Sequence, residues 1–267
     1  MTSLIAWLGV DSRGPASVYI ASDSRLSRSG INWDCGRKVF ACQNSSDLFG
    51  YCGAVLFPSQ FLGQLTASID ARVLFPPNST PDDRLEVLER KLQLAVVDFP
   101  EQAPFTIVYA TRVGEGYPSS FFIATLSWDR NERITREVYP LPTFSDLLLA
   151  RGSGKPIVED YQFNWRHSDI GRTSRAVFSA FCDSISSGRD VATGGPPQLA
   201  GLYLRGPSTA FGIIHNGACY LHGMRCELGP DSLLECRNRL FERCAVDGKL
   251  IGKRHARPAF SPLLNGQ

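Results

Sequence analysis

The order of strand-like and helix-like segments constrains the fold of this chain more than any other feature. Apolar segments at residues 4–10 and 16–22 are joined by a polar turn that contains Gly14-Pro15, and this pattern predicts a β-hairpin at the start of the chain. Further strands are predicted from apolar runs bounded by turn residues, at 38–42, 48–54, 105–111, 121–128 and 134–139.

Helical patterns separate these strands into blocks. Apolar residues recur at helical spacing over 58–74, and a second helix is predicted to begin after Thr80, with Pro81 in its first turn. An amphipathic helix is predicted over 173–187, and a last helix over 231–243.

Strands also follow the third helix. Apolar runs at 198–204 and 211–214 are followed by Asn216-Gly217, a strong hairpin signal. The segment around Gly30 is predicted to be a polar loop. The predicted order is strands, two helices, strands, a helix, strands and a last helix. This order favours two sheets packed face to face with helices outside, an α+β architecture.

Length and composition fit one compact unit. The chain has 267 residues, of which 43% are hydrophobic and 20% charged, so it can bury a sizeable core. We expect a single domain over residues 1–245 and a basic, proline-containing tail over 246–267. The formal net charge is +2 and the basic residues are scattered, which argues against a nucleic-acid partner.

The sequence also indicates a location. The first ten residues lack a basic region and a long apolar stretch, and no run of 18 apolar residues occurs, so neither a signal peptide nor a membrane partner is expected. Eight cysteines without a Cys-x-x-Cys pair fit a reducing compartment, and we expect a cytoplasmic protein in which most of them pack as small apolar residues, Cys35, Cys42 and Cys52 among them.

Thr2 is the first candidate for chemistry. If Met1 is removed, a hydroxyl and a free α-amine stand on the same residue. An α-amine titrates near pH ~7.7–8.0, so at neutral pH it can accept the hydroxyl proton directly or through one water. Many proteins begin with Met-Thr, and this feature alone is therefore a weak signal of catalysis.

Six short motifs follow one another along the chain at characteristic separations. Lys38 and Gly53 are 15 residues apart, and Ser153 and Asp190 are 37 apart. The motifs are Thr2, Ala21-Ser22-Asp23-Ser24-Arg25, Lys38-Val39, Gly50-x-x-Gly53, Gly152-Ser153-Gly154 and Asp190-x-x-Thr193-Gly194-Gly195. Together they resemble the proteasome β-subunit family and its bacterial two-ring relative, which are N-terminal-nucleophile (Ntn) hydrolases. The resemblance implies a four-layer αββα sandwich of two antiparallel sheets flanked by helices.

The resemblance also assigns catalytic roles. Thr2 would be the nucleophile and its α-amine the base. Lys38 would be a cation beside the hydroxyl that stabilises the alkoxide and lowers the pKa of the amine, and Asp23 would hold the ammonium in place. Arg25 would be structural.

Five further residues complete the expected site. The backbone N–H of Gly53 would donate to the oxyanion, and Ser153, Asp190 and Thr193 would support the α-amine through hydrogen bonds. Thr193 stands where the family more often has Ser. Gly50 is expected to leave room for a large apolar substrate side chain before the cleaved bond.

The implied activity is threonine-type hydrolysis of peptide bonds through an ester on Thr2, without a cofactor. The resemblance implies peptides or unfolded proteins as substrates, a homo-oligomeric ring and an ATP-dependent unfoldase as a possible partner. Two alternatives stay open, because a fold does not fix its substrate. One is a non-peptide amidohydrolase, and the other is a non-catalytic structural subunit in which Thr2 stays blocked by Met1.

One other group of residues could hold a metal. His215-x-x-x-Cys219-x-x-His222-x-x-x-Cys226 has metal-ligating side chains at close spacing. Asn216-Gly217 places a hairpin turn among them, and strand alternation then directs these side chains to different faces. We therefore expect no metal site from this motif.

Overall fold

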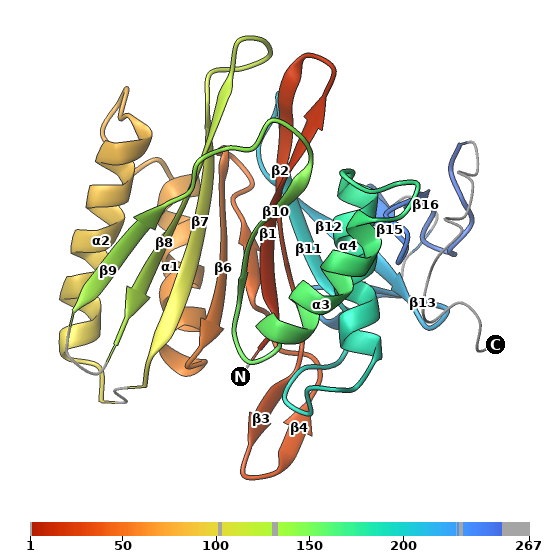
Figure 1. The fold of residues 1–267 in the computed structure, drawn as a ribbon. Coiled ribbons are helices and arrows are strands. Elements are labelled where there is room, and N and C mark those ends of the chain that lie inside the picture. The colour runs from red at the N-terminus through yellow and green to blue at the C-terminus, as the bar shows by residue number, and fades with distance from the viewer. Residues whose placement is uncertain (1, 101–102, 130–132, 228, 230–231, 253–267) are drawn as a thin grey trace.

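Two large sheets form the centre of the protein (Figure 1). The computed structural model describes residues 2–100, 103–129, 133–227, 229 and 232–252. The larger sheet has the strand order β10-β1-β2-β11-β12-β13-β14, with β15 and β16 continuing from β12. Its strands are β1 Leu4–Asp11, β2 Gly14–Ser22, β10 Asp146–Arg151, β11 Gln198–Tyr203, β12 Thr209–His215, β13 Ala218–Leu221, β14 Met224–Arg225, β15 Cys236–Arg237 and β16 Arg243–Cys244.

The second sheet has five strands in sequence order, β5-β6-β7-β8-β9. All its pairings are antiparallel, whereas the larger sheet contains a parallel pairing between β12 and β15. Its strands are β5 Val39–Ala41, β6 Asp47–Gly53, β7 Phe105–Val113, β8 Ser120–Trp128 and β9 Ile134–Val138.

The two sheets pack against each other through one face of each. Leu4, Ile20 and Ala200 of the larger sheet share a buried cluster with Leu48 and Val108 of the smaller sheet. Strand alternation explains this, because the neighbouring residues of β1 and β6 point to the opposite faces. At about 25 cal/mol per Å² of apolar surface, this burial is a main source of stability.

Helices α1 (Leu56–Asp70) and α2 (Pro81–Val97) cover the outer face of the smaller sheet, where they share a buried cluster with its side chains (Figure 1). The predicted start of α2 is confirmed: Thr80 accepts the N–H of Asp83, and the Asp83 carboxylate accepts the N–H of Thr80.

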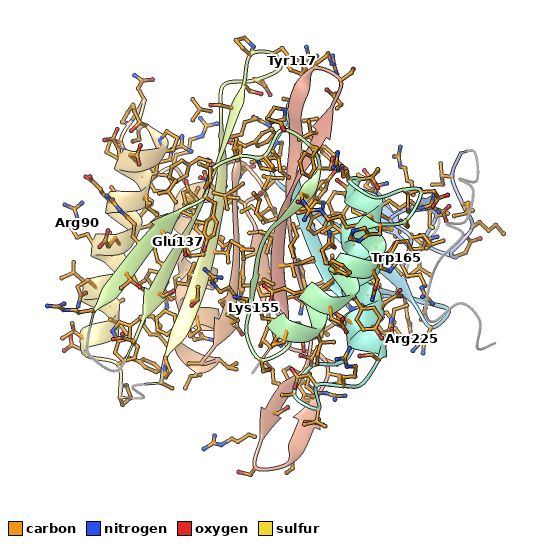
Figure 2. All side chains as sticks on the ribbon, in the orientation of Figure 1. Arg90, Tyr117, Glu137, Lys155, Trp165 and Arg225 are labelled. Carbon is orange, nitrogen blue, oxygen red and sulfur yellow. The ribbon has the colours of Figure 1, made fainter. Side chains whose placement is uncertain are left out.

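Helices α3 (Lys155–Arg166) and α4 (Ser174–Ser186) lie on the outer face of the larger sheet. Trp165 of α3 donates its indole N–H to buried Asp183 of α4 at 2.9 Å, and Figure 2 shows its position on this side of the molecule. The chain thus combines helices and two packed sheets in an α+β arrangement.

Two local predictions are wrong. The segment around Gly30 is a hairpin rather than a loop, formed by β3 (Leu26–Arg28) and β4 (Ile31–Trp33) with positive φ at Ser29 and Gly30. No helix occupies the described part of 231–243: β15 pairs with β12, and β16 pairs with β15, so tertiary pairing overrides the local preference.

Candidate active site

The first hairpin fixes the N-terminal residues. β1 and β2 pair from Leu4 opposite Ser22, which places Ser3 beside Asp23. The carbonyl oxygen of Ser3 accepts the N–H of Asp23 and the hydroxyl of Ser22, both at 3.1 Å. The N–H of Ser3 donates to Asp23 Oδ1 at 3.0 Å. Thr2 is therefore held next to the Asp23 carboxylate through its neighbour in the chain.

Asp23 and Lys38 form a fully buried ion pair. Lys38 Nζ donates to Asp23 Oδ1 at 2.8 Å, and both side chains are 0% exposed. The other oxygen, Asp23 Oδ2, accepts the N–H groups of Arg25 and Gly194 at 3.1 Å each. Burial raises the pKa of Asp23 and lowers the pKa of Lys38, while the ion pair between them opposes both shifts.

A second hydrogen-bonded group contacts Thr2 from the other side. The N–H of Thr2 donates to Ser153 Oγ at 3.3 Å, and Ser153 Oγ donates to Asp190 Oδ2 at 2.7 Å. Thr193 Oγ1 donates to the same carboxylate oxygen at 2.8 Å and lies 2.9 Å from Ser3 Oγ. Ser153 on the one hand, and Asp190 and Thr193 on the other, are distant in the sequence, and the structure links both parts to Thr2 and Ser3 just before β1.

Two glycines allow this close approach. A Cβ on Gly152 would lie 1.9 Å from the carbonyl oxygen of Thr2, and the φ of Gly152 is +89°. A Cβ on Gly154 would lie 1.8 Å from Ser3 Oγ. The Gly-Ser-Gly motif therefore brings the Ser153 hydroxyl against the N-terminal residues because its flanking positions carry no side chain.

Gly53 ends β6 with its N–H directed toward β5. The N–H of Tyr51 bonds to the Lys38 carbonyl on the β5 side, and the N–H of Ala54 bonds to the Pro104 carbonyl on the opposite side. Successive N–H groups along a strand point alternately to its two sides, so the N–H of Gly53 points to the same side as that of Tyr51, toward β5. Gly53 lies beyond the residue at which β5 begins. Its φ is +98°. The N–H of Gly53 thus projects on the side from which Lys38 comes.

The expectation for Gly50 requires correction. A side chain at position 50 would point into the core between the sheets, because a Cβ there would lie 2.7 Å from Ile20 Cγ2 and 3.0 Å from Leu4 Cδ1. Gly50 is absent from the residues that line the pocket beside Gly53. The missing side chain of Gly50 lets the sheets pack closely and leaves no room for a substrate.

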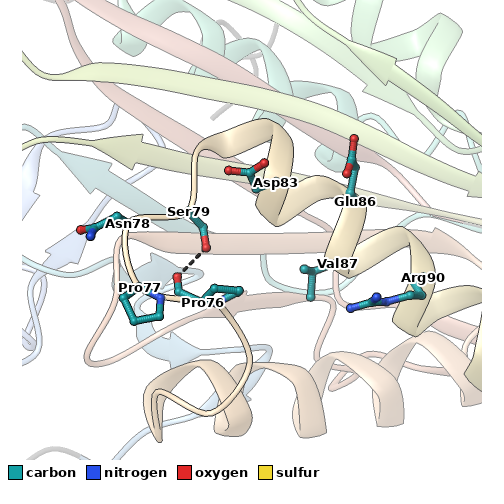
Figure 3. A pocket seen from close by; sticks show the side chains of 8 residues that line it. All are labelled: Pro76, Pro77, Asn78, Ser79, Asp83, Glu86, Val87 and Arg90. Atoms are coloured by element: carbon teal, nitrogen blue, oxygen red, sulfur yellow. Dashed lines mark hydrogen bonds between the residues drawn. The ribbon is translucent and has the colours of Figure 1, made fainter.

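The pocket beside Gly53 has a volume of about 770 Å³. The β3–β4 hairpin forms one wall and the start of α1 forms the other. Its lining includes Leu26, Ile31, Trp33, Val55 and Leu56, with Arg28 as the single charged residue among those that line it. Another pocket, between the 76–79 loop and α2, contains none of the candidate catalytic residues (Figure 3).

An arginine clamp joins the loop before β5 to the 190–195 loop. Arg25 binds both carboxylate oxygens of Asp34, at 2.7 and 2.8 Å, and donates to the carbonyl groups of Val191 and Thr193 at 3.2 and 3.4 Å. A Cβ on Gly194 would lie 2.4 Å from the guanidinium carbon. These bonds give Arg25 a structural role, which is the role that the resemblance implies. The sequence offers no spacing signal that would identify Asp34 as its partner.

Gln198 is a further residue that sequence reasoning missed. Its amide nitrogen donates to the carbonyl oxygen of Asp23, to Ser24 Oγ and to the carbonyl oxygen of Gly36, at 3.1, 3.0 and 2.6 Å. Its amide oxygen accepts the N–H of Lys38 at 3.0 Å. Gln198 therefore fixes the backbone of both ion-pair residues. A polar residue at the start of a strongly apolar strand is the signal that could have found it.

Within the described ranges, no three His, Cys, Asp or Glu side chains are grouped so that they could hold a metal ion. None of the helices described there combines the length and the apolar character that a membrane span requires. Met1 lies outside the described residues.

No protein-family model and no curated protein sequence matches the chain. A solved structure does: the bacterial proteasome homologue BPH of Thiobacillus denitrificans, in complex with epoxomicin, superimposes with a TM-score of 0.50. The two sequences are 16% identical, and the match covers 76% of this chain and all of that one. At this identity the likeness concerns the fold alone. The chain therefore has a proteasome-like fold.

Proposed function

We propose that this protein is an N-terminal threonine hydrolase with the four-layer αββα Ntn architecture. The observation that carries the proposal is the convergence of Asp23, Lys38, Ser153 and Asp190 on the first residues of the chain. Each of these residue types has a defined task in nucleophilic catalysis by an N-terminal hydroxyl. A purely structural reason for burying the Lys38 ammonium against Asp23 is weak, because buried ion pairs contribute little net stability.

Removal of Met1 exposes the α-amine that acts as base. The nitrogen of Thr2 already contacts Ser153 Oγ, which in turn bonds to Asp190. As an amine, this nitrogen accepts the proton of the Thr2 hydroxyl, and the Asp190 carboxylate stabilises the resulting ammonium through Ser153. The Lys38 cation stabilises the alkoxide that develops on Thr2.

Acyl transfer then proceeds in two steps. The Thr2 oxygen attacks the substrate carbonyl carbon, the C–N bond breaks, and the ammonium gives its proton to the leaving amine. Water next attacks the ester and releases the acid, with the amine again as base. The N–H of Gly53 donates to the oxyanion in both steps, an interaction that typically contributes ~2.7–4 kcal/mol.

The pocket beside Gly53 supports an apolar substrate group. Ile31 and Trp33 are 74% and 58% exposed along its hairpin wall, and Leu56 is 55% exposed on the opposite wall. Burying such side chains against a substrate releases about 25 cal/mol per Å². We propose that the residue before the cleaved bond is large and apolar, for this reason and not because of Gly50.

Assembly and partners extend the same proposal. A proteasome-like fold supports peptides or unfolded chains as substrates and a homo-oligomeric ring, and an ATP-dependent unfoldase would then deliver the chains.

A panel of fluorogenic substrates tests the activity. Peptides that differ only in the residue before the cleaved amide should be hydrolysed fastest when that residue is Leu, Phe or Tyr, and Thr2→Ala should remove the turnover. Hydrolysis of small amides but of no peptide would instead establish a non-peptide amidohydrolase. Absence of all turnover in protein that lacks Met1 would favour a structural subunit.

A further inference from the structure

The β3–β4 hairpin, which projects from the body of the protein in Figure 1, has two different faces. Directly opposite residues of two paired strands share a face, and the faces alternate along each strand. One face carries two opposite pairs, an inner pair of Leu26 with Trp33 and an outer pair of Arg28 with Ile31. The other face carries Ser27 opposite Asn32, and these two side chains bond to each other at 2.7 Å.

The face with the inner and outer pairs forms a wall of the pocket beside Gly53, because all four of its residues line that pocket. Ile31 and Trp33 are exposed there, although both are large and apolar. The pocket volume of about 770 Å³ lies within the range of about 300–1,000 Å³ that is typical of ligand sites. The wall therefore offers a substrate more than the space for one side chain.

The inner pair is the part of this wall closest to the catalytic group. Leu26 and Trp33 adjoin Arg25 and Asp34, whose salt bridge closes the base of the hairpin. The N–H of Arg25 donates to Asp23 Oδ2 at 3.1 Å. The outer pair lies two residues further toward the tip, a distance of about 6.8 Å along an extended strand. The wall is thus apolar near the catalytic group and positively charged further out.

The charge of Arg28 has no counter-ion on the page of contacts that surrounds it. No acidic residue is among those that line the pocket, and the ion pairs formed by the described residues do not include Arg28. An apolar group placed over the guanidinium would take its charge out of water without a partner, which is costly. A carboxylate would instead accept two charge-assisted hydrogen bonds from it.

The proposed reaction places the acyl side of the substrate in this pocket. The leaving amine takes its proton from the Thr2 nitrogen, which contacts Ser153, and neither Ser153 nor Asp190 lines the pocket. In an extended peptide, residues two positions apart point to the same side at a spacing of about 6.8 Å, which equals the spacing of the inner and outer pairs. A substrate whose last acyl residue packs on the inner pair therefore brings the residue two positions earlier to the outer pair.

We propose that Arg28 makes this protein prefer peptides with an acidic side chain two positions before the large apolar residue at the cleaved bond. This inference rests on the proposed function, since it specifies the substrate class of the same site. The guanidinium bonds to the carboxylate, and Ile31 packs against the methylene groups of the acidic side chain. Because this contact is far from the reacting atoms and equal in the ground and transition states, it should lower KM and leave kcat nearly constant.

Acetylated fluorogenic peptides that carry Glu, Gln or Lys at this position test the preference, because acetylated peptides with a blocked carboxyl end contain no other carboxylate. We expect kcat/KM to be about two- to fivefold higher for Glu than for Gln, lowest for Lys, and less different at high salt. Arg28→Gln should bring the Glu-to-Gln ratio close to one, and Arg28→Glu should favour Lys. The matched control Arg90→Gln, in the other pocket (Figure 3), should keep the wild-type ratio.

Trp33 supplies a binding readout that needs no turnover. It is exposed, whereas the other three tryptophans, Trp7, Trp128 and Trp165, are buried. In the Thr2→Ala protein, the Glu peptide should shift the tryptophan emission to shorter wavelength as it covers Trp33. The shift should require a lower concentration of the Glu peptide than of the Gln peptide, and Trp33→Phe in the same background should remove it.

The results that would overturn the inference are distinct from those that test the hydrolase. Equal rates and equal binding of the Glu and Gln peptides would overturn it while the hydrolase activity stands, as would a preference for Glu that persists in Arg28→Gln. Shielding of Trp33 from acrylamide in the free protein would show that a second copy of the chain covers the wall, and would also overturn it. If no peptide is hydrolysed, the proposed function fails, and the fluorescence titration still decides whether Arg28 selects acidic peptides.

Discussion

Replacing Lys38 with Met should lower both the free energy of unfolding and the rate of acylation at Thr2. A second substitution should separate the two effects. The substitution keeps an unbranched chain but removes the ammonium that bonds to Asp23 at 2.8 Å. Since both side chains are 0% exposed, it leaves a buried carboxylate without its counter-ion. Breaking a buried pair in this way typically costs about 3–5 kcal/mol of the free energy of unfolding.

A second variant shows whether the buried charge is responsible. In the double variant Asp23→Asn, Lys38→Met no charge is stranded, so part of the loss should be recovered. Recovery should be incomplete, because Asp23 accepts the N–H groups of Ser3, Arg25 and Gly194 and the Asn NH₂ group cannot accept them. Urea unfolding at neutral pH measures all three free energies.

The chemistry should not recover with stability. Both variants lack the cation that we propose stabilises the Thr2 alkoxide, so acylation by an electrophile should be about 10²–10³-fold slower in each. Two results would refute this reasoning. One is a Lys38→Met protein as stable as the wild type, and the other is a double variant that acylates at the wild-type rate.

Substitutions at three further positions probe the group around Ser153. Gly152→Ala places a Cβ 1.9 Å from the Thr2 carbonyl oxygen at a φ of +89°. It should lower the free energy of unfolding by at least about 1–3 kcal/mol and abolish acylation of Thr2. Normal acylation would contradict the close packing. Thr193→Val keeps the volume but removes the hydroxyl that bonds to Asp190, with an expected cost of about 1–3 kcal/mol by thermal unfolding, whereas Thr193→Ser should cost little. For Asp190, burial acts to raise the pKa, but hydrogen bonds from Ser153, the N–H of Ala192 and Thr193 hold it below the usual 3.8. The Asp190 carboxylate therefore contributes to the free energy of unfolding fully above pH 3.8, and this contribution is lost as the pH falls through the folded-state pKa. In Asp190→Asn the free energy of unfolding should fall less steeply over that acidic range. The same fall as in the wild type would refute the assignment.

Much of the fold is readable from local signals. The Gly14-Pro15 turn, the Thr80 cap with Pro81 and the Asn216-Gly217 turn each correspond to an observed element boundary. These features depend on residues close together in the chain, so the sequence carries them directly.

Features that depend on long-range contacts were less accessible. The last strands form because β12 offers an edge to β15, and no periodicity in residues 231–243 indicates that edge. The motif spacing predicts a substrate pocket at Gly50, but the packing of Gly50 depends on Ile20 and Leu4 across the sheet interface. The spacing of the motifs selects residues several of which lie close together in the structure, yet it does not show which face of β6 each glycine occupies.

The same limit applies to the supporting residues of the site. Asp34 and Gln198 stabilise the Asp23 and Lys38 segments through bonds that span from 9 to 175 positions. Single polar residues of this kind have no motif of their own. They become recognisable only when the backbone groups that they bond are placed in space.

The most direct test of the central claim is the intact mass of the purified protein before and after exposure to a β-lactone, beside a Thr2→Ala control. We predict a starting mass without Met1 and a single adduct that is absent from the control. That result would establish an activated N-terminal threonine. Protein that lacks Met1 but forms no adduct, or an adduct that persists in Thr2→Ala, would contradict the proposed chemistry.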